Sequence, residues 1–103
     1  MPIGVTRWER RDGADRNRFA LAALDYCRAW RATAGIRSSR FYWADVDTLV
    51  VLTDGHSFDI LDLPQTPELA KALFSLSAVG RPAGSERWTE AAAGEATFRL
   101  SLE

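Results

Sequence analysis

The sequence has few of the residues from which common catalytic and metal sites are built. Its 103 residues include a single cysteine, Cys27, and a single histidine, His56. One cysteine cannot form a disulfide within the chain or a cysteine-based metal cluster. One histidine among scattered acidic residues makes a poor transition-metal site. We find no Ser/His/Asp order, nucleotide-binding loop or phosphate cradle, so the sequence predicts no metal and no cofactor.

A strong charge of one sign and long apolar runs are also missing. The formal net charge is −1 at pH 7, which gives no general attraction to nucleic acid or anionic membrane. No apolar run approaches the roughly 20 residues that a helix needs to cross a bilayer. The N-terminal residues show no charged start followed by an apolar core, as a signal peptide does. We therefore expect a cytoplasmic protein without a nucleic-acid or membrane partner.

The composition is ordinary for one globular domain. Hydrophobic residues make up 47% of the sequence and charged residues 26%, and a chain of this length has room for one modest core. We therefore expect a single domain over residues 1–103. Of the thirteen basic residues only Lys71 is a lysine. This excess of arginine is typical of a GC-rich genome, and it also supplies planar donors that suit carboxylates and subunit contacts.

Two segments show the hydrophobic periodicity of a helix. Residues 16–34 repeat apolar side chains at spacings of three and four, and Gly35 follows where a helix typically ends. Cys27 lies on the apolar side of this helix, where we expect a buried rather than a reactive thiol. Residues 66–68, Thr-Pro-Glu, begin the second helix with a capping hydroxyl, an early proline and an acidic first turn. We expect this helix to stop at Gly80.

Runs of β-forming residues predict four strands, at residues 3–10, 36–44, 48–54 and 96–102. The link between the second and third strands is so short that they form an antiparallel hairpin. Residues 81–85 are expected to be a loop, and residues 86–93 a short extra helix around Trp88. Residues 57–63 are ambiguous between a strand, a helical turn and an irregular segment, and we favour the irregular interpretation.

The third strand is the most informative segment because it is apolar on both faces. Leu49 and Val51 point to one side of the sheet, and Val50 and Leu52 point to the other. In so small a protein, two helices shield only one side. A second copy of the chain or a ligand then has to cover the other side.

The order strand, helix, strand, strand, helix, strand defines the expected architecture. Right-handed crossovers give a four-stranded antiparallel sheet with both helices on one side, which is the ferredoxin-like α+β arrangement βαββαβ. This order, the short helix before the last strand, and an aromatic strand at Arg40–Trp43 leading into Leu49–Leu52 resemble the dimeric α+β barrel superfamily. The resemblance covers nearly the whole chain as a pattern. It implies a homodimer in which two open sheet faces pair and enclose a pocket in each subunit.

The activity implied by this resemblance is broad. The superfamily includes cofactor-independent monooxygenases, haem-degrading enzymes, isomerases and cyclases, and many members have no known activity. No catalytic motif of any subfamily matches this sequence residue by residue, so no functional residue is carried over. One interpretation is a small-molecule-binding enzyme of the monooxygenase or isomerase type. The alternative is a non-catalytic dimerisation or regulatory ligand-binding module.

Strand alternation predicts which side chains line the open side of the sheet. Placing Trp8, Phe41 and Trp43 under the helices turns several polar residues outward, around an apolar floor that suits an anionic, aromatic ligand. The candidate ligand-binding residues are Arg7, Arg40, Tyr42, Trp88 and Arg99. The candidate dimer-interface residues are Val50 and Leu52. Alternatively, the arginines pair across the dimer interface with the acidic residues Glu9, Asp45 or Asp47.

His56 is the one candidate for a general base. It follows the third strand beside Gly55. A catalytic histidine needs both a partner that orients it and a pocket that holds substrate. A loop histidine is more often solvated, so we expect catalysis by His56 only if the fold supplies both.

Overall fold

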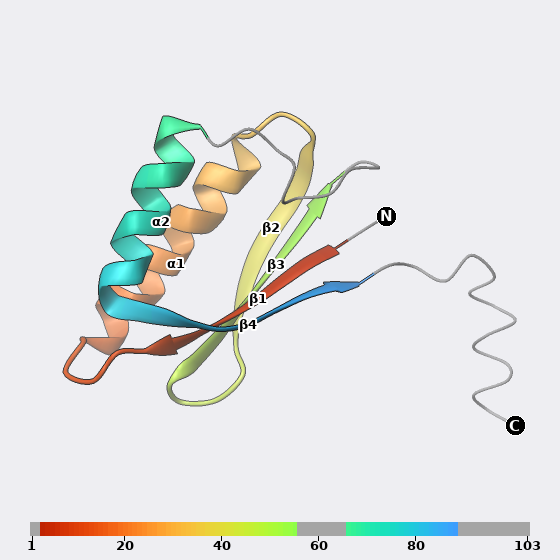
Figure 1. The fold of residues 1–103 in the computed structure, drawn as a ribbon. Coiled ribbons are helices and arrows are strands. Elements are labelled where there is room, and N and C mark those ends of the chain that lie inside the picture. Colours follow the sequence, from red (N-terminus) through yellow and green to blue (C-terminus); the bar gives the residue numbers. More distant parts are fainter. Residues whose placement is uncertain (1–2, 56–65, 89–103) are drawn as a thin grey trace, which may run out of the picture.

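The structure, a computed structural model that describes residues 3–55 and 66–88, is a sheet covered on one side by two helices (Figure 1). Along the chain the elements are β1 (Ile3–Arg10), α1 (Arg16–Arg31), β2 (Ile36–Trp43), β3 (Thr48–Gly55), α2 (Pro67–Val79) and β4 (Gly80–Trp88). All neighbouring strands are antiparallel, in the order β2-β3-β1-β4. The predicted ferredoxin-like α+β architecture is therefore confirmed.

Both helices begin where the sequence predicts, because a side-chain oxygen caps each first turn. Asp15 accepts a hydrogen bond from a backbone N–H of α1, and Thr66 does the same for α2. Such caps satisfy N–H groups that have no partner inside the helix. The end of α1 differs from the prediction. The helix stops at Arg31 rather than at residue 34, and Gly35 takes a φ of 90° in the turn before β2.

The core lies between one face of the sheet and the inner sides of both helices. Its buried residues are Trp8 from β1, Leu49 and Val51 from β3, six residues of α1 (Phe19, Ala23, Tyr26, Cys27, Ala29 and Trp30) and Leu69, Ala72 and Leu76 from α2. The ring of Tyr26 meets those of Trp8 and Trp30 edge to face, with centroids 6.2 and 6.1 Å apart. Aromatic pairs favour this geometry, which adds to the burial energy of the core.

The strand that completes the sheet corrects the sequence-based prediction. The sequence predicts a loop at residues 81–85, a helix from residue 86 and a last strand at 96–102. Instead, Gly80–Trp88 forms β4 and pairs with β1 directly after α2. The loop is therefore wrong, and the helix is wrong at residues 86–88. Residues 89–93 and 96–102 lie outside the described part of the chain.

Two residues explain why β4 is hard to recognise in the sequence. Pro82 and Gly84 are both typical of loops, but an edge strand tolerates proline because its outer N–H groups need no partner in the sheet. The register between β1 and β4 shifts at Arg7 and Trp8, which leaves Ala83 as an extra residue. Every β4 residue after the first is exposed, so the strand shows no apolar alternation.

Gly80 joins α2 to β4 at a point where the core leaves no room for a side chain. Its φ of −137° is open to any residue, so packing rather than backbone conformation requires glycine. A Cβ atom at this position would lie 2.5 Å from Cε1 of Phe19. The Phe19 side chain is fully buried, and a close-packed interior gives its ring little space to withdraw.

We expect Gly80→Ala to lower the free energy of unfolding by about 1–3 kcal/mol, the usual cost of an extra methyl group in a filled core. Urea denaturation measures this change. Ser85→Ala, at an exposed position of the same strand, is the control and should change stability by less than about 0.5 kcal/mol. If the clash with Phe19 is the cause, Phe19→Leu will cost less in the Gly80→Ala background than in the wild type. Equal costs in the two backgrounds would contradict this explanation.

Candidate functional site

The side of the sheet that carries no helix brings together most of the predicted site residues. We call it the open face. Its cross-strand rows, read from β2 to β4, are Tyr42–Val50–Arg7–Gly84, Arg40–Leu52–Val5–Glu86 and Ser38–Asp54–Ile3–Trp88, and Glu9 and Arg81 pair at one end of it. The structure thus places Arg7, Arg40 and Tyr42 on the same face as Val50 and Leu52. Their role as a ligand site or a dimer interface stays a prediction.

An apolar strip runs along the centre of the open face. Val50 and Leu52 are half-buried in the single chain, and Val5 beside them is fully buried. Two aromatic side chains stand at the margins, with Tyr42 51% and Trp88 44% exposed. An apolar centre with aromatic residues around it is typical of surfaces that contact a partner.

Most arginines on the open face already have acidic partners within the chain. The Nε of Arg7 lies 3.8 Å from Oε1 of Glu86, and the Nη2 of Arg81 lies 3.0 Å from Oε2 of Glu9. Glu9 is therefore engaged inside its own chain rather than left for an arginine across an interface. Among the described residues Arg40 is different, because it is exposed and contacts no carboxylate.

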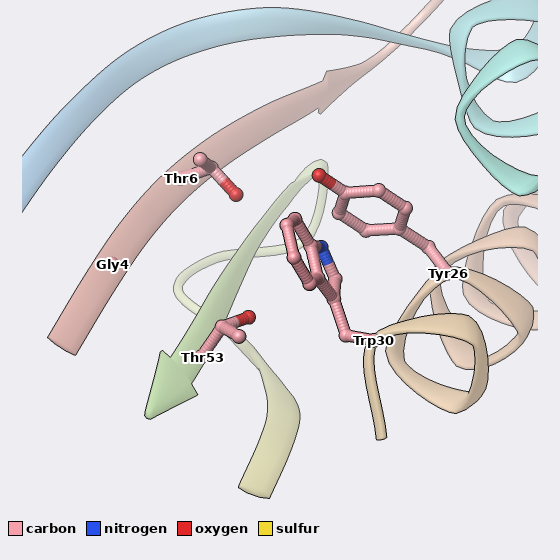
Figure 2. A pocket seen from close by; sticks show the side chains of 5 residues that line it. All are labelled: Gly4, Thr6, Tyr26, Trp30 and Thr53. Carbon is pink, nitrogen blue, oxygen red and sulfur yellow. The ribbon is translucent and has the colours of Figure 1, made fainter. Parts of the chain in front are cut away.

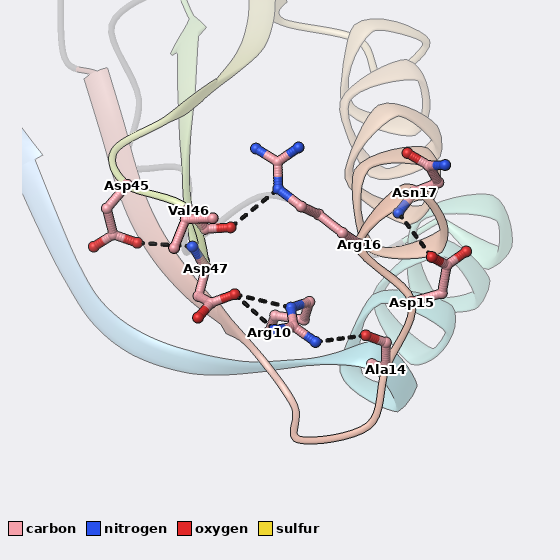
Figure 3. A network of polar contacts seen from close by, with 8 residues as sticks. All are labelled: Arg10, Ala14, Asp15, Arg16, Asn17, Asp45, Val46 and Asp47. Carbon is pink, nitrogen blue, oxygen red and sulfur yellow. Dashed lines mark hydrogen bonds and ion pairs between the residues drawn. The ribbon is translucent and has the colours of Figure 1, made fainter.

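The two carboxylates of the turn between β2 and β3 also have hydrogen-bond partners within the chain (Figure 3). Asp47 accepts two hydrogen bonds from the guanidinium group of Arg10, at 2.8 and 3.0 Å. Asp45 accepts a hydrogen bond from the backbone N–H of Asp47 at 2.9 Å. This bond, together with contacts to Thr48, lowers the pKa of the Asp45 carboxyl group. The two acids therefore stabilise the turn.

The start of α1 holds the same turn from the helix side. The guanidinium group of Arg16 lies 3.8 Å from the ring centroid of Trp43. The Nε of Arg16 also donates a hydrogen bond to the carbonyl of Val46 (Figure 3). Cation–π contacts of this kind favour arginine over lysine. Phe19 of α1 also contacts Trp43, and the centroids of the two rings lie 5.9 Å apart. These contacts fix the β2–β3 hairpin to α1.

A small cavity lies on the helix side of the sheet, between β1, β3 and α1 (Figure 2). It is lined by Gly4, Thr6, Tyr26, Trp30 and Thr53. Its volume of about 30 Å³ would hold about two water molecules but no aromatic ring. The helical periodicity of residues 16–34 assigns Tyr26 and Trp30 to the core, and none of the five lining residues is among the predicted site residues. The available signal was the pair of threonines, which occupy strand positions that alternation assigns to the core.

The cavity walls carry hydroxyl groups in apolar surroundings. The Thr6 hydroxyl accepts a hydrogen bond from the indole N–H of Trp8 at 3.3 Å, and the Thr53 hydroxyl shares one with Ser39 at 2.9 Å. Burial raises the pKa of the Tyr26 hydroxyl, so this group stays protonated at neutral pH and can donate a hydrogen bond. A few polar groups on apolar walls are what a small-molecule site requires.

Cys27 takes the buried position that the sequence predicts. Burial raises the pKa of its thiol, and a hydrogen bond with Ser39 offsets only part of this effect. The thiolate is the reactive form of cysteine, so a raised pKa makes the group less nucleophilic at neutral pH. Cys27 is therefore a packing residue.

The remaining predicted site residues lie either outside the described residues or on a different element from the one expected. His56, Arg99 and residues 57–63 lie outside the described residues. Trp88 ends β4 on the open face rather than standing on a helix, and its indole N–H donates to Glu86 at 2.8 Å. Residues 3–55 and 66–88 contain no cluster of side chains that could hold a metal ion. In the same residues, no helix is long and apolar enough to span a membrane.

The fold and the open face together define a structural class. A four-stranded antiparallel sheet has both helices on one side and an apolar strip on the other, which is the ferredoxin-like fold. No protein-family model matches the sequence, and no curated protein matches it. The fold is therefore assigned from structure.

Solved structures with this fold resemble the chain over most of its length. Rv0793 from Mycobacterium tuberculosis is 24% identical with a TM-score of 0.68, over 86% of this chain and 94% of that one. SnoaB, a cofactor-independent oxygenase from Streptomyces nogalater, is 12% identical with a TM-score of 0.69, over 85% and 90%. A dimeric protein of unknown function and ferredoxin-like fold from Bacteroides fragilis is 11% identical with a TM-score of 0.64, over 84% and 93%. At these identities the similarity shows the fold alone.

Proposed function

We propose that the protein is a homodimer that binds a small aromatic molecule and oxidises it as a cofactor-independent monooxygenase-like enzyme. The observation that carries the proposal is the open face, where Val50 and Leu52 stay only half-buried and neither described helix packs on them. The similarity to SnoaB, a cofactor-independent oxygenase, supports the reaction type over an isomerase-like one.

A second copy of the chain is the proposed cover of the open face. A two-fold interface presents the same patch from both copies, so a patch with an apolar centre and a polar margin can pack against itself. The dimeric ferredoxin-like protein from Bacteroides fragilis supports this arrangement. In the dimer, Val50 and Leu52 are central interface residues, and Tyr42 and Trp88 lie nearer its margin.

The ligand is proposed to bind in the cavity beside α1 rather than on the open face. On the open face Arg7 and Trp88 both contact Glu86, which reduces their capacity to bind an anion. The cavity offers the hydroxyl groups of Thr53 and Tyr26, with Trp30 as an aromatic wall. An aromatic substrate would need this aromatic wall to move, because the cavity is about 30 Å³ in the present conformation.

Chemistry without a cofactor limits the class of substrate. The electrons that reduce O₂ then have to come from the substrate, so we propose an electron-rich phenol or hydroquinone. Hydrogen-bond donors that are already in place stabilise negative charge on a substrate oxygen as it develops. The protonated Tyr26 hydroxyl and the Thr53 hydroxyl supply such donors.

A non-catalytic dimerisation or ligand-binding module is the second candidate function. The small volume of the cavity favours it, since about 30 Å³ is room for water rather than for a substrate. The open face would then serve association alone. Dimer formation and oxygen consumption distinguish the two candidates, because only the first requires both.

We expect Leu52→Asp to convert the dimer into a monomer, because the change would bury an unpaired charge at the centre of the interface. Size-exclusion chromatography with light scattering gives the mass. Leu21→Asp makes the same change on α1, where Leu21 is 59% exposed, and should leave the mass at twice that of one chain. A folded Leu52→Asp variant that remains dimeric would show that the open face is not the interface.

We expect electron-rich phenols or hydroquinones to quench tryptophan fluorescence and to drive O₂ consumption without added metal or cofactor. Thr53→Val keeps the side-chain shape but removes a hydroxyl, so kcat/KM should fall about tenfold, which corresponds to one hydrogen bond of about 1.4 kcal/mol. Thr48→Val, on the same strand but on the open face, should leave kcat/KM unchanged. Quenching without O₂ consumption would favour the non-catalytic module. The absence of both would contradict the ligand site.

A further inference from the structure

The cavity beside α1 has three hydroxyl groups on its walls. Thr6 of β1 and Thr53 of β3 supply two of them, and Tyr26 of α1 supplies the third. Figure 2 shows the hydroxyl oxygens of both threonines turned toward the aromatic side chains of α1. The side chains that line the cavity include no carboxylate, amide or imidazole group, which are the usual acceptors in a ligand site. The direction of the hydroxyl protons therefore decides what the cavity can bind.

The hydroxyl of Thr6 has its proton to spare. Its oxygen accepts a hydrogen bond from the indole N–H of Trp8 at 3.3 Å. An indole N–H can only donate, so the direction of this bond is fixed. The Thr6 hydroxyl donates to no acceptor among residues 3–55 and 66–88. Its proton is therefore available to a group in the cavity.

Tyr26 is the second donor. Its side chain is only 8% exposed. Burial raises the pKa of its hydroxyl, and a hydrogen bond from Trp30 offsets part of this rise, so the group keeps its proton at neutral pH. The indole of Trp30 can only donate, so this bond uses the oxygen of Tyr26 and leaves the phenolic proton free for the cavity.

Thr53 becomes the third donor through a buried neighbour. Its hydroxyl shares a hydrogen bond of 2.9 Å with that of Ser39, and both residues are buried. Ser39 also contacts Cys27, which stays a thiol at neutral pH because burial raises its pKa. A thiol sulfur is a weak acceptor, so the Ser39 proton goes to the oxygen of Thr53 instead. The Thr53 proton is then left for the cavity.

We infer that the cavity is a site for an anionic oxygen, which accepts hydrogen bonds from Thr6, Tyr26 and Thr53. The inference rests on the function proposed above, and in that function the oxygen is the ionised hydroxyl group of the substrate. The protein then binds a phenolate rather than a neutral phenol. Hydrogen bonds to an ionised acceptor are stronger than those to a neutral one, so three donors around one acceptor favour the charged form.

The size of the cavity suits this role. A volume of about 30 Å³ holds an oxygen atom and one neighbouring atom but no aromatic ring. The oxygen of the substrate would occupy the cavity, and its ring would lie where Trp30 now forms the wall. A small inorganic anion such as chloride would need no such movement.

Charges around the cavity are compatible with an anion. Arg87 of β4 stands opposite Gly4 in the register, so both residues lie on the helix side of the sheet. Asp54 is the acid nearest to Thr53 in sequence, but it belongs to the open face because successive strand residues alternate. None of the five residues that line the cavity is acidic. No carboxylate on the cavity wall therefore repels an anion.

para-Nitrophenol tests this preference, because its visible absorption reports whether its oxygen is ionised. Its ring is electron-poor, so the oxidation proposed above does not consume it. We expect the phenolate to bind at least about tenfold more tightly than the phenol, which lowers the pKa of the bound molecule below that of the free one. A pH titration with excess protein measures this pKa. para-Nitrotoluene has a methyl group in place of the hydroxyl and should bind far more weakly than the phenolate.

Variants that remove one hydroxyl each identify the donors. Thr6→Val and Tyr26→Phe keep the side-chain shape, and each should weaken phenolate binding by about tenfold or more, as expected for a lost hydrogen bond to a charged group. Binding of para-nitrotoluene should stay unchanged, which a general change of cavity shape would not allow. Thr48→Val, on the other face of β3, is the control and should change neither affinity. Circular dichroism checks the fold of each variant.

Chloride tests the same donors without an aromatic ring. A ligand that binds only the native state raises the free energy of unfolding, so chloride should stabilise the protein. Urea denaturation in sodium chloride and in sodium gluconate at equal ionic strength measures this effect, because gluconate is too large for the cavity. Thr6→Val should reduce the difference between the two salts, and Thr48→Val should not.

Different results overturn different claims. Bound para-nitrophenol with a raised pKa would overturn the inference while the proposed ligand site stands, and so would a lowered pKa that neither Thr6→Val nor Tyr26→Phe changes. Binding of neither chloride nor para-nitrophenol would also overturn it. Chloride binding alone would support the anion site and contradict a phenol substrate. A lowered pKa without oxidation of electron-rich phenols would support the inference and contradict the proposed oxygenase.

Discussion

The strand β3 carries apolar side chains on both faces, and this pattern determines how the sheet has to be covered. Leu49 and Val51 pack under the helices, while Val50 and Leu52 point to the opposite side and stay half-buried. Since successive strand residues alternate, no shift of the strand removes this conflict. Both described helices pack on the side of the sheet that carries Leu49 (Figure 1), and we propose that a second copy of the chain covers the other side.

Much of the fold could be predicted from the sequence because the starts of both helices carry strong local signals. Asp15 and Thr66 mark the two helix starts through their capping oxygens. The strand β4 could not be predicted, because the signal for a strand is apolar alternation and every β4 residue after Gly80 is exposed. Pro82 and Gly84 point to a loop, and only the pairing with β1 shows that an edge strand accommodates them.

The sequence predicts which residues share the open face, but it does not predict which of them form ion pairs. Strand alternation alone indicates that Arg7, Arg40 and Tyr42 share a face with Val50 and Leu52. The ion-pair partners of these side chains depend on which strands are neighbours. Because residues 81–85 were expected to be a loop, the contacts between β4 and β1 could not be predicted. The cavity beside α1 was out of reach for a similar reason, because the register and helix packing bring its threonines together from separate strands.

The mass of the unmodified protein in solution shows whether a second copy covers the open face. Sedimentation equilibrium over a dilution series from high to low micromolar concentration gives this mass without any label. We expect twice the mass of one chain at the upper end of the series, with a reversible fall toward the mass of one chain on dilution. The mass of one chain across the whole series would contradict it, because Val50 and Leu52 would then stay only half-buried with no second copy over them.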